Sequence, residues 1–348
     1  MALKVGFSGF GAAGRYLHAP LVRAAGMEVA ALATSRKEEA AETFPEARVV
    51  PDFDALLDVQ GLDLVVVVTP NVLHASQVRA ALEAGLNVVV DKPATPTRGE
   101  AEALADLAEA KGLKLAVYHN RRFDSDFLTL EKVVREGHLG EIANARFTMD
   151  RFRPVVLDRW RDRPAPASGN LYDLGSHLID QALLLCGMPD WLQADVFAQR
   201  PGSETADGFE VLMGKGRQRL TLGVTLFSTS PRDRFRFEGD KGLFRKPGID
   251  PQEEHLRAGM DPLAPGFGVE QPSDFGEIVF ADGTRREIPS EKGDWLTFYK
   301  RMRAAIETGG DVPVTMREAA RTIGVIEAAH ASARDGRRIA LSPEGHWT

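Results

Sequence analysis

The sequence predicts an α/β protein of two parts, a doubly wound parallel sheet followed by an α+β domain with a large, mainly antiparallel sheet. In the first third, short apolar runs alternate with alanine-rich helical runs, and beyond about residue 120 that alternation is lost. The length of 348 residues also exceeds what one hydrophobic core normally organises. We therefore place the domains at 1–120 and 121–348, with the C-terminal helix a candidate to pack back on the first.

Five runs of the first domain are expected to form the parallel sheet. They are apolar nearly throughout, as burial on both faces of a strand requires. Between the last two, Thr97-Arg98-Gly99-Glu100 has the spacing of a capping box and Gly112 is placed to end the helix. The expected strands are Lys4–Phe7, Val29–Ala33, Leu64–Val68, Asn87–Val90 and Leu113–Tyr118.

Beyond residue 120, strands follow one another across short turns, which is typical of an antiparallel sheet. The stretch Lys246–Ser273 holds five prolines and several glycines, so we expect a long surface excursion there. Met316–Ala333 is expected to be a helix whose buried stripe is Ala320, Ile323, Ile326 and Ala329. The other expected elements are a helix at Phe127–Glu136, strands at Ile142–Asp150, Leu192–Ala198, Gly208–Met213 and Arg219–Phe227, and a short run at Arg338–Leu341.

Bulk composition favours a folded protein with a small-molecule partner. The formal charge is -7, whereas nucleic acid and anionic lipid attract basic surfaces. The single cysteine, Cys186, excludes an internal disulfide framework, and its leucine-rich surroundings favour a buried thiol over a nucleophile. The sequence starts without a signal peptide and has no run long enough to span a membrane, so we expect a cytoplasmic protein.

The strongest local motif is Gly9-Phe10-Gly11-Ala12-Ala13-Gly14, between the first expected strand and a helical run. In that context G-x-G-x-x-G is the fingerprint of a Rossmann-type dinucleotide-binding turn. Gly9 permits the tight turn, Gly11 lets the backbone approach the pyrophosphate, and Gly14 lets helix and strand pack closely. The N–H groups of this loop and of the helix start are expected to bind phosphate.

The end of the second strand indicates which dinucleotide fits. An NAD site usually has Asp or Glu about 20 residues past the glycines to hold the ribose 2′-hydroxyl. Here the strand ends in Thr34-Ser35-Arg36-Lys37 instead. Ser35 can hydrogen-bond a 2′-phosphate and Arg36 can meet its charge, so NADP(H) is favoured. NAD(H) remains possible, because the two basic residues also suit a solvated helix start paired with the glutamates that follow.

Two further motifs carry candidate chemistry. Lys92 and Pro93 directly follow an apolar strand, at the carboxyl end where open α/β sheets bind ligands. Asp173 and His177 are four residues apart on an expected helix and therefore share a face. Histidine titrates near neutral pH and can act as a general base. A lysine can stabilise a developing negative charge by its own charge and by hydrogen bonding.

Each candidate also has a structural alternative. An isolated helical histidine is more often a hydrogen-bonded structural residue than a base. Asp173, His177 and Asp180 could ligate a metal, but no second histidine or cysteine with ligand spacing accompanies them, so we predict no metal. Arg122 follows a strand end and either binds substrate oxygens or forms an ion pair. Asn120 either hydrogen-bonds a hydroxylated substrate or caps the next helix.

These motifs, together with the segments Tyr118–Asp126 and Tyr172–Asp180, resemble the glucose–fructose oxidoreductase / inositol dehydrogenase / rhizopine-catabolism (Gfo/Idh/MocA) family over nearly the whole chain. That family is known for a glycine fingerprint, a Glu-Lys-Pro motif and an Asp-x-x-x-His motif. Within it, the sequence looks most like the branch that contains NADP-dependent scyllo-inositol dehydrogenases. It departs from the family pattern at Asp91, where Glu usually precedes the lysine.

The resemblance implies a role for each matching residue. Lys92 would contact the substrate hydroxyl and the nicotinamide, Asp173 would orient the substrate, and His177 would be the general base. The residues implied to line the cofactor groove are Thr69, Pro70, Asn71 and His74, with Lys92 and Pro93 beside them. The substrate set also includes Asn120, Arg122 and Tyr172.

The resemblance further implies a homodimer or homotetramer built on the C-terminal sheet. Apolar residues at alternate positions of one expected strand would suit such an interface. They are Leu220, Leu222, Val224 and Leu226.

The main functional hypothesis is an NADP-preferring dehydrogenase or reductase of a cyclic polyol, an aldose or a related keto compound, working by base-assisted hydride transfer. A non-catalytic cofactor-binding sensor would keep the fold and the fingerprint, but the Lys–His pair is intact here, which favours an enzyme. A third hypothesis keeps the cofactor and changes the reaction to reduction of a non-sugar carbonyl or imine. The sequence offers no residue that decides against it.

Overall fold

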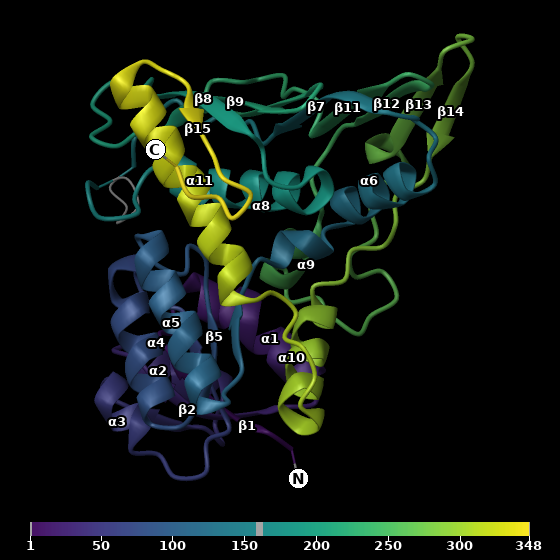
Figure 1. Cartoon of the computed structure of the whole chain (residues 1–348). Helices are drawn as coiled ribbons and strands as arrows, with labels where there is room; N and C mark the ends of the chain where they lie inside the picture. Colours follow the sequence, from purple (N-terminus) through teal and green to yellow (C-terminus); the bar gives the residue numbers. More distant parts are fainter. Residues whose placement is uncertain (1, 158–162, 348) are drawn as a thin grey trace. The chain divides into compact units, whose positions relative to one another are not determined.

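The chain forms two compact units (Figure 1). The computed structural model describes residues 2–157 and 163–347. The first unit contains Met1–Phe123, Pro251–Phe267 and Asp294–Ala320, and the second contains Asp124–Asp250, Gly268–Gly293 and Arg321–Thr348. The first unit therefore combines the segment expected as the first domain with two later segments. One of these later segments is fixed by Arg303, whose Nη1 donates to the carbonyl of Ala25 at 3.1 Å.

A six-stranded sheet in the order β3-β2-β1-β4-β5-β6 forms the core of the first unit, and all its paired strands are parallel. The order reverses between β1 and β4, which places the loops after these two strands side by side at the carboxyl edge. The predicted doubly wound sheet is confirmed, although the short β3 was not predicted. The strands are β1 Lys4–Ser8, β2 Glu28–Ala33, β3 Arg48–Val50, β4 Leu64–Val67, β5 Asn87–Val90 and β6 Leu115–Val117.

Helices cover this sheet, and α4 and α5 lie side by side along it (Figure 1). The predicted capping box is present, since Thr97 Oγ1 accepts from the N–H of Glu100 at 3.3 Å and Glu100 Oε2 accepts from the N–H of Thr97 at 3.1 Å. Gly112 ends the helix with a φ of 66°. The helices are η1 Ala13–His18, which is a π-helix, α1 Ala19–Ala24, α2 Lys37–Thr43, α3 Phe53–Leu57, η2 Asn71–Leu73, α4 His74–Glu83, α5 Arg98–Lys111, η3 Asn120–Phe123, α9 Gln252–Arg257 and α10 Leu296–Thr308.

A nine-stranded sheet in the order β14-β13-β12-β11-β7-β10-β9-β8-β15 forms the second unit. Its pairs are antiparallel except for β7 with β10, which confirms the prediction of a large, mainly antiparallel sheet. Its strands are β7 Ile142–Thr148, β8 Trp191–Phe197, β9 Gly208–Lys215, β10 Gln218–Val224, β11 Phe235–Gly239, β12 Gly242–Lys246, β13 Gly276–Phe280, β14 Arg285–Ile288 and β15 Ile339–Ala340.

The helices α6 and α8 lie against one face of this second sheet (Figure 1). Buried side chains such as Leu178 of α8 and Phe147 of β7 fill the space between helices and sheet. The long helix α11 begins in the first unit and continues into the second, and its predicted stripe is buried. The helices are α6 Ser125–Arg135, α7 Asn170–Asp173, α8 Gly175–Cys186, η5 Pro272–Asp274 and α11 Met316–Asp335.

The apolar alternation in β10 has a different role from the one we inferred. Leu220, Leu222 and Val224 are at most 2% exposed and belong to the core of the second unit, and Leu226 is also buried. A period of two shows only that one face of a strand is covered, and here the chain's own helices cover it. These residues are therefore not available to a partner subunit.

The expected surface excursion at Lys246–Ser273 is exposed over most of residues 257–266, but it is not irregular throughout. The stretch includes the end of β12 and the helix α9, and Leu256 and Phe267 are buried. Proline is compatible with a helix start, and Pro251 is the N-cap of α9. Proline content alone therefore did not exclude an ordered, packed segment.

Two of the bulk expectations can be compared with the structure. Cys186 is a free, half-buried thiol, and burial raises its pKa to about 11, which opposes a nucleophilic role. Among the helices of the described residues, none combines the length and the apolar character needed to cross a membrane.

Candidate active site

The glycine loop follows β1, and its three glycines meet different surroundings. Gly9 has a φ of 98°, and a Cβ there would lie 2.8 Å from the carbonyl oxygen of Val68. A Cβ on Gly14 would lie 2.8 Å from the carbonyl oxygen of Gly9 and 3.1 Å from the Val68 side chain. A Cβ on Gly11 would meet nothing within 4 Å. The loop is therefore closely packed at both ends and open at Gly11, as a loop that receives a diphosphate requires.

The loop after β4 adjoins the glycine loop, and one glutamine connects the two strand ends. Gln77 Oε1 accepts from Ser8 Oγ and from Thr69 Oγ1, both at 3.0 Å. Pro70 is exposed and Asn71 is half-buried. Thr69, Pro70 and Asn71 therefore lie at the reversal in strand order, where dinucleotides bind in folds of this kind.

His74 was predicted to line the cofactor groove, but its ring is buried and engaged by the backbone. Nδ1 lies 2.9 Å from the carbonyl oxygen of Pro93, and Nε2 lies 2.8 Å from that of Thr69. Burial lowers the pKa of His74, against the opposing effects of Asp91 and of the two carbonyls. The ring thus joins the loops after β4 and β5, and its nitrogens are not directed to an open groove.

A cluster of charged side chains lies where β2 ends and α2 begins. Arg36 is 59% exposed, its N–H donates to Thr34 Oγ1 at 3.0 Å, and its Nη1 lies 3.5 Å from Glu39 Oε2. Arg15, on η1, forms an ion pair with the same Glu39. Ser35 is exposed beside them. The geometry therefore agrees with both interpretations of Arg36. As a residue that faces solvent it can receive a 2′-phosphate, and as a residue of the helix start it pairs with a nearby glutamate.

Lys92 lies directly after β5, at the same carboxyl edge, and is half-buried. The Lys92–Pro93 peptide bond is cis. The N–H of Lys92 donates to Asp91 Oδ1 at 2.7 Å. Burial alone would raise the pKa of Asp91, but His18, Lys92 and His74 favour its charged form and hold that pKa below its ordinary value.

At the end of β6, the structure separates the two candidates for substrate contact. Asn120 begins η3 and is buried, and β6 pairs with β5, so Asn120 lies at the same sheet edge as Lys92. Arg122 Nη1 instead forms an ion pair with Glu318 Oε1 at 2.7 Å. Burial would raise the pKa of Glu318, but Arg122 keeps it below its ordinary value. Of the two alternatives for Arg122, the structure therefore favours the ion pair over a contact with substrate.

The second unit holds the other candidates, at the junction of α7 and α8. Asp173 ends α7 and is half-buried, whereas His177 lies in the first turn of α8 and is buried. The single expected helix is interrupted at Leu174, whose carbonyl accepts from the N–H of His177 at 3.2 Å. Leu174 keeps helical dihedral angles, so the chain direction is maintained through the junction.

The start of this junction is fixed by tight packing. Gly169 has a φ of 85°, and a Cβ there would lie 2.8 Å from the carbonyl oxygen of Ala206. Asn170 Nδ2 donates to the carbonyl of Asp207 at 2.6 Å. Tyr172 stacks on His330 of α11, with ring centroids 5.6 Å apart. Burial lowers the pKa of His330, so that ring is neutral near neutral pH.

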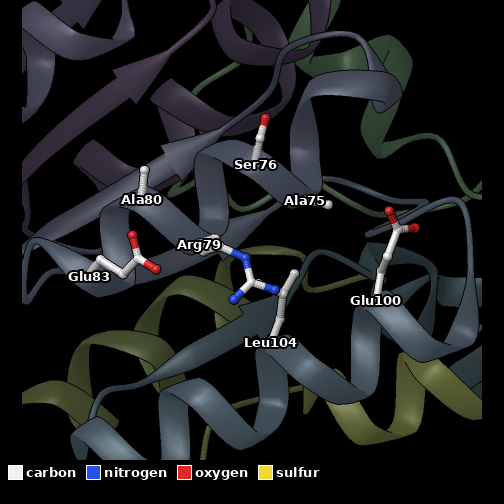
Figure 2. Close-up of a pocket in the computed structure, with 7 residues that line it drawn as sticks. All are labelled: Ala75, Ser76, Arg79, Ala80, Glu83, Glu100 and Leu104. Atoms are coloured by element: carbon white, nitrogen blue, oxygen red, sulfur yellow. The ribbon is translucent and has the colours of Figure 1, made fainter.

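Among the described residues, no group of three or more His, Cys, Asp and Glu side chains is placed to hold a metal ion. A groove of about 310 Å³ lies between α4 and α5. The Arg79 side chain extends across it toward Leu104, and Glu83 and Glu100 lie at its two ends (Figure 2). Its charged side chains are exposed, and it contains none of the candidate site residues.

Sequence reasoning anticipated Glu39 as a local partner of Arg36. It missed three other residues that border the candidate site, which are Arg15, His18 and Tyr299. Arg15 and Glu39 are separated by 24 positions, and His18 and Tyr299 by 281. Arg15 directly follows Gly14, which places it near the cofactor loop, but nothing in the sequence pairs it with Glu39. Tyr299 lies on a helix far along the chain, and no local pattern could connect it to His18.

Comparison with known proteins gives matches over nearly the entire chain. Residues 3–119 match the Gfo/Idh/MocA description "Oxidoreductase family, NAD-binding Rossmann fold", and residues 131–341 match "Oxidoreductase family, C-terminal alpha/beta domain". The chain is 39% identical over 345 residues to the scyllo-inositol 2-dehydrogenase (NADP(+)) of Bacillus subtilis, covering 97% of this chain and 96% of that protein.

Two further matches broaden the comparison. A D-xylose 1-dehydrogenase (NADP(+)) of Haloferax volcanii is 28% identical over 331 residues, which is 92% of this chain and 94% of that protein. The solved structure of an oxidoreductase from Bacillus subtilis superposes with a TM-score of 0.95 at 38% identity, covering 98% of this chain and 99% of that one.

Proposed function

The chain belongs to the Gfo/Idh/MocA oxidoreductase family, and on that basis we propose that it is an NADP-preferring dehydrogenase of a secondary hydroxyl on a cyclic polyol or sugar. The observation that carries the proposal is the arrangement at one sheet edge of an open glycine loop, a basic cluster after β2 and a lysine after β5. The polyol class is supported by the relatives, which are named as inositol and xylose dehydrogenases.

The residues of the first unit fit a nicotinamide dinucleotide phosphate. The space beside Gly11 is open, and a diphosphate bound there would accept from the N–H groups at the start of the helical segment. Arg15 and Arg36 already converge on one carboxylate, that of Glu39. A 2′-phosphate carries more negative charge than a carboxylate and could bind the same two guanidinium groups. NAD remains a possible second cofactor, since an uncharged ribose 2′-hydroxyl can bind without the two guanidinium groups.

In the proposed mechanism, His177 accepts the proton of the substrate hydroxyl, because a neutral imidazole is a base suited to neutral pH. The Lys92 ammonium stabilises the negative charge that develops on the same oxygen. Asp173, at the end of α7, orients the substrate by accepting a hydrogen bond from a neighbouring hydroxyl. When bound, the cofactor supplies the hydride acceptor. Asn120 and Tyr172 are proposed as further substrate contacts, and Arg122 is assigned to its ion pair with Glu318.

A panel assay tests this function. Wild type, Lys92→Met and His177→Ala are each given NADP with scyllo-inositol, other inositols and aldoses, and reduced nicotinamide is followed by absorbance. We expect wild-type turnover and a loss of at least about a thousandfold in kcat for either variant, with NADPH still bound by His177→Ala. Binding of NADPH without turnover of any polyol or aldose would contradict the proposal and favour a sensor or a reductase of another carbonyl.

Cofactor preference is tested separately by binding. Arg36→Asp and Arg15→Ala should each weaken NADPH, as measured by fluorescence titration, by about tenfold or more, while NADH binding changes little. Arg79→Ala, in the groove of Figure 2, is the matched control and should alter neither affinity. Equal losses for the two cofactors would remove the argument for a 2′-phosphate site.

We also propose that the protein is a cytoplasmic homo-oligomer, assembled through the second sheet. The face of that sheet opposite the helices is the available one, and Leu212 of β9 is exposed there. A sedimentation measurement that finds only monomer would contradict this proposal.

A further inference from the structure

A group of buried aromatic and titratable side chains lies in the first unit next to Asp91, the residue that precedes Lys92. His18, at the end of η1, and Tyr299, on α10, are both fully buried. His18 Nδ1 lies 2.6 Å from Tyr299 Oη, and the ring packs on Tyr118 with centroids 4.0 Å apart. On its other side, His18 Nε2 lies 3.8 Å from Asp91 Oδ2. Neither the glycine fingerprint nor the assignment of Lys92 uses this group.

Asp91 connects this group to Lys92. One carboxylate oxygen, Oδ1, accepts from the N–H of Lys92 at 2.7 Å, and the other, Oδ2, faces His18. The N–H of Asp91 donates to the carbonyl of Val67 on β4 at 2.9 Å. The carboxylate therefore holds the backbone at the point where the chain leaves β5, and a change in its charge or direction acts first on Lys92.

The protonation of Tyr299 follows from its burial. Burial raises the pKa of Tyr299 well above its ordinary value, and the negative charge of Asp91 raises it further. The tyrosine therefore keeps its proton at neutral pH and can donate it to His18 Nδ1. A neutral imidazole that accepts at Nδ1 carries its hydrogen on Nε2. That hydrogen is directed to the side of the ring that faces the Asp91 carboxylate.

We propose that His18 is a positioning residue for Lys92, acting through Asp91, and that Tyr299 fixes the orientation and tautomer of its ring. The inference rests on the proposed function only in taking Lys92 as the group that is positioned. It also explains how the chain accommodates Asp91, which has one methylene fewer than the glutamate of the family motif and whose carboxylate faces His18.

The proposal predicts a specific pH effect. The titratable groups that face Asp91 are His18 on η1, Lys92 on the same loop, His74 on α4 and Tyr299 on α10. Burial favours the neutral acid, and among the groups that favour the carboxylate His18 contributes most. Without a donor at Nε2, the pKa of Asp91 should rise. Lys92 is positioned only while the Asp91 carboxylate is charged. As the pH falls, activity should therefore be lost at a higher pH than in wild type.

Two substitutions separate positioning from simple packing. In His18→Gln the amide nitrogen can occupy the position of Nε2, which faces Asp91, whereas in His18→Asn it can occupy only that of Nδ1, which faces Tyr299. Tyr299→Phe keeps the ring packing and removes the hydroxyl. His138→Asn, a surface histidine paired with Glu136, is the matched control.

The measurements are kcat against pH with NADP and scyllo-inositol, NADPH binding by fluorescence, and titration of the Asp91 carboxyl by ¹³C NMR, assigned with Asp91→Asn. For His18→Asn we expect kcat at neutral pH to fall about tenfold. The pH at which kcat is half lost on the acid side should rise by about one unit, and NADPH binding should be unchanged. His18→Gln should recover most of the loss, and Tyr299→Phe should show a smaller shift of the same sign.

An Asp91 carboxyl that titrates in His18→Asn as in wild type would overturn the proposal. Equal losses in His18→Gln and His18→Asn, with no change in the pH profile, would also overturn it, because they would show a packing role alone. If wild type oxidises no member of the polyol panel, the proposed function fails, and the carboxyl titration still decides whether His18 acts on Asp91.

Discussion

Gly11 and Gly14 belong to one motif, yet the structure gives them separate physical reasons to be glycine. Gly11 borders open space, so the protein alone places no restriction on a side chain there. Gly14 lies against the carbonyl of Gly9 and the side chain of Val68, so a side chain there would displace the backbone. Glycine is therefore needed at position 11 so that a ligand can approach the backbone, and at position 14 so that the loop can pack.

This difference gives a prediction for a matched pair of variants. Gly11→Ala should leave the melting temperature unchanged or slightly higher and weaken NADPH binding by about tenfold or more, because the methyl group enters the space for the diphosphate. Gly14→Ala should lower the free energy of unfolding by about 1–3 kcal/mol. Thermal unfolding and fluorescence titration check both. A Gly11→Ala protein that binds NADPH as wild type does would contradict the placement of the diphosphate.

Single residues were predictable from sequence where local pattern alone determines their surroundings. The glycine fingerprint and Lys92 at a strand end are of this kind, because strand, turn and helix follow one another within a few residues. Arg122 and Leu220 were interpreted less well, because their partners, Glu318 and the helices over the second sheet, lie far along the chain. Spacing indicates that a side chain is paired or buried, but it does not identify the residue or element that contacts it.

At the scale of elements, a buried ion pair joins segments of the second unit. Lys246 Nζ, at the end of β12, donates to Glu270 Oε2 at 2.6 Å, and both side chains are almost completely buried. Ser290 Oγ donates to the same oxygen at 2.6 Å, and Ser125 Oγ, at the start of α6, donates to Oε1 at 2.5 Å. The network thus connects β12, the segment 268–293 and the first turn of α6.

Removing one charge from this network should be costly. Glu270→Gln leaves the Lys246 ammonium buried without its counter-charge, and we expect the free energy of unfolding to fall by about 3–5 kcal/mol. The control is Glu291→Gln in the same unit, which breaks a solvent-exposed ion pair with Lys132 and should lower the free energy of unfolding far less. Denaturant unfolding of the two variants makes the comparison, and similar losses would show that the buried network has no special weight.

The elements that sequence patterns predicted are those with continuous apolar runs or clear caps. Five strands of the first sheet and the helix α5 were found close to their observed bounds. The strands β11–β14 and the helix α10 were not predicted. The strands are short, as Phe235–Gly239 shows, and their pairing depends on partners outside the local segment. The short β3 offers too few residues for any period.

At the scale of the whole molecule, the proposed reaction requires both units. In the proposal, Lys92 and the residues that fit a dinucleotide belong to the first unit, and Asp173 and His177 belong to the second. The family match spans both parts of the chain, and two of the relatives that it resembles along its length are named as an inositol and a xylose dehydrogenase. The central claim is therefore that hydride moves between a carbinol carbon and a nicotinamide.

The most direct test of that claim follows the hydrogen itself. Wild type is incubated with NADP and scyllo-inositol deuterated on carbon, and the reduced cofactor is analysed by mass spectrometry. The account predicts NADPH that carries a single deuterium taken from the substrate, and none when His177→Ala replaces wild type. Unlabelled NADPH, or no NADPH from any deuterated polyol of the panel, would contradict it.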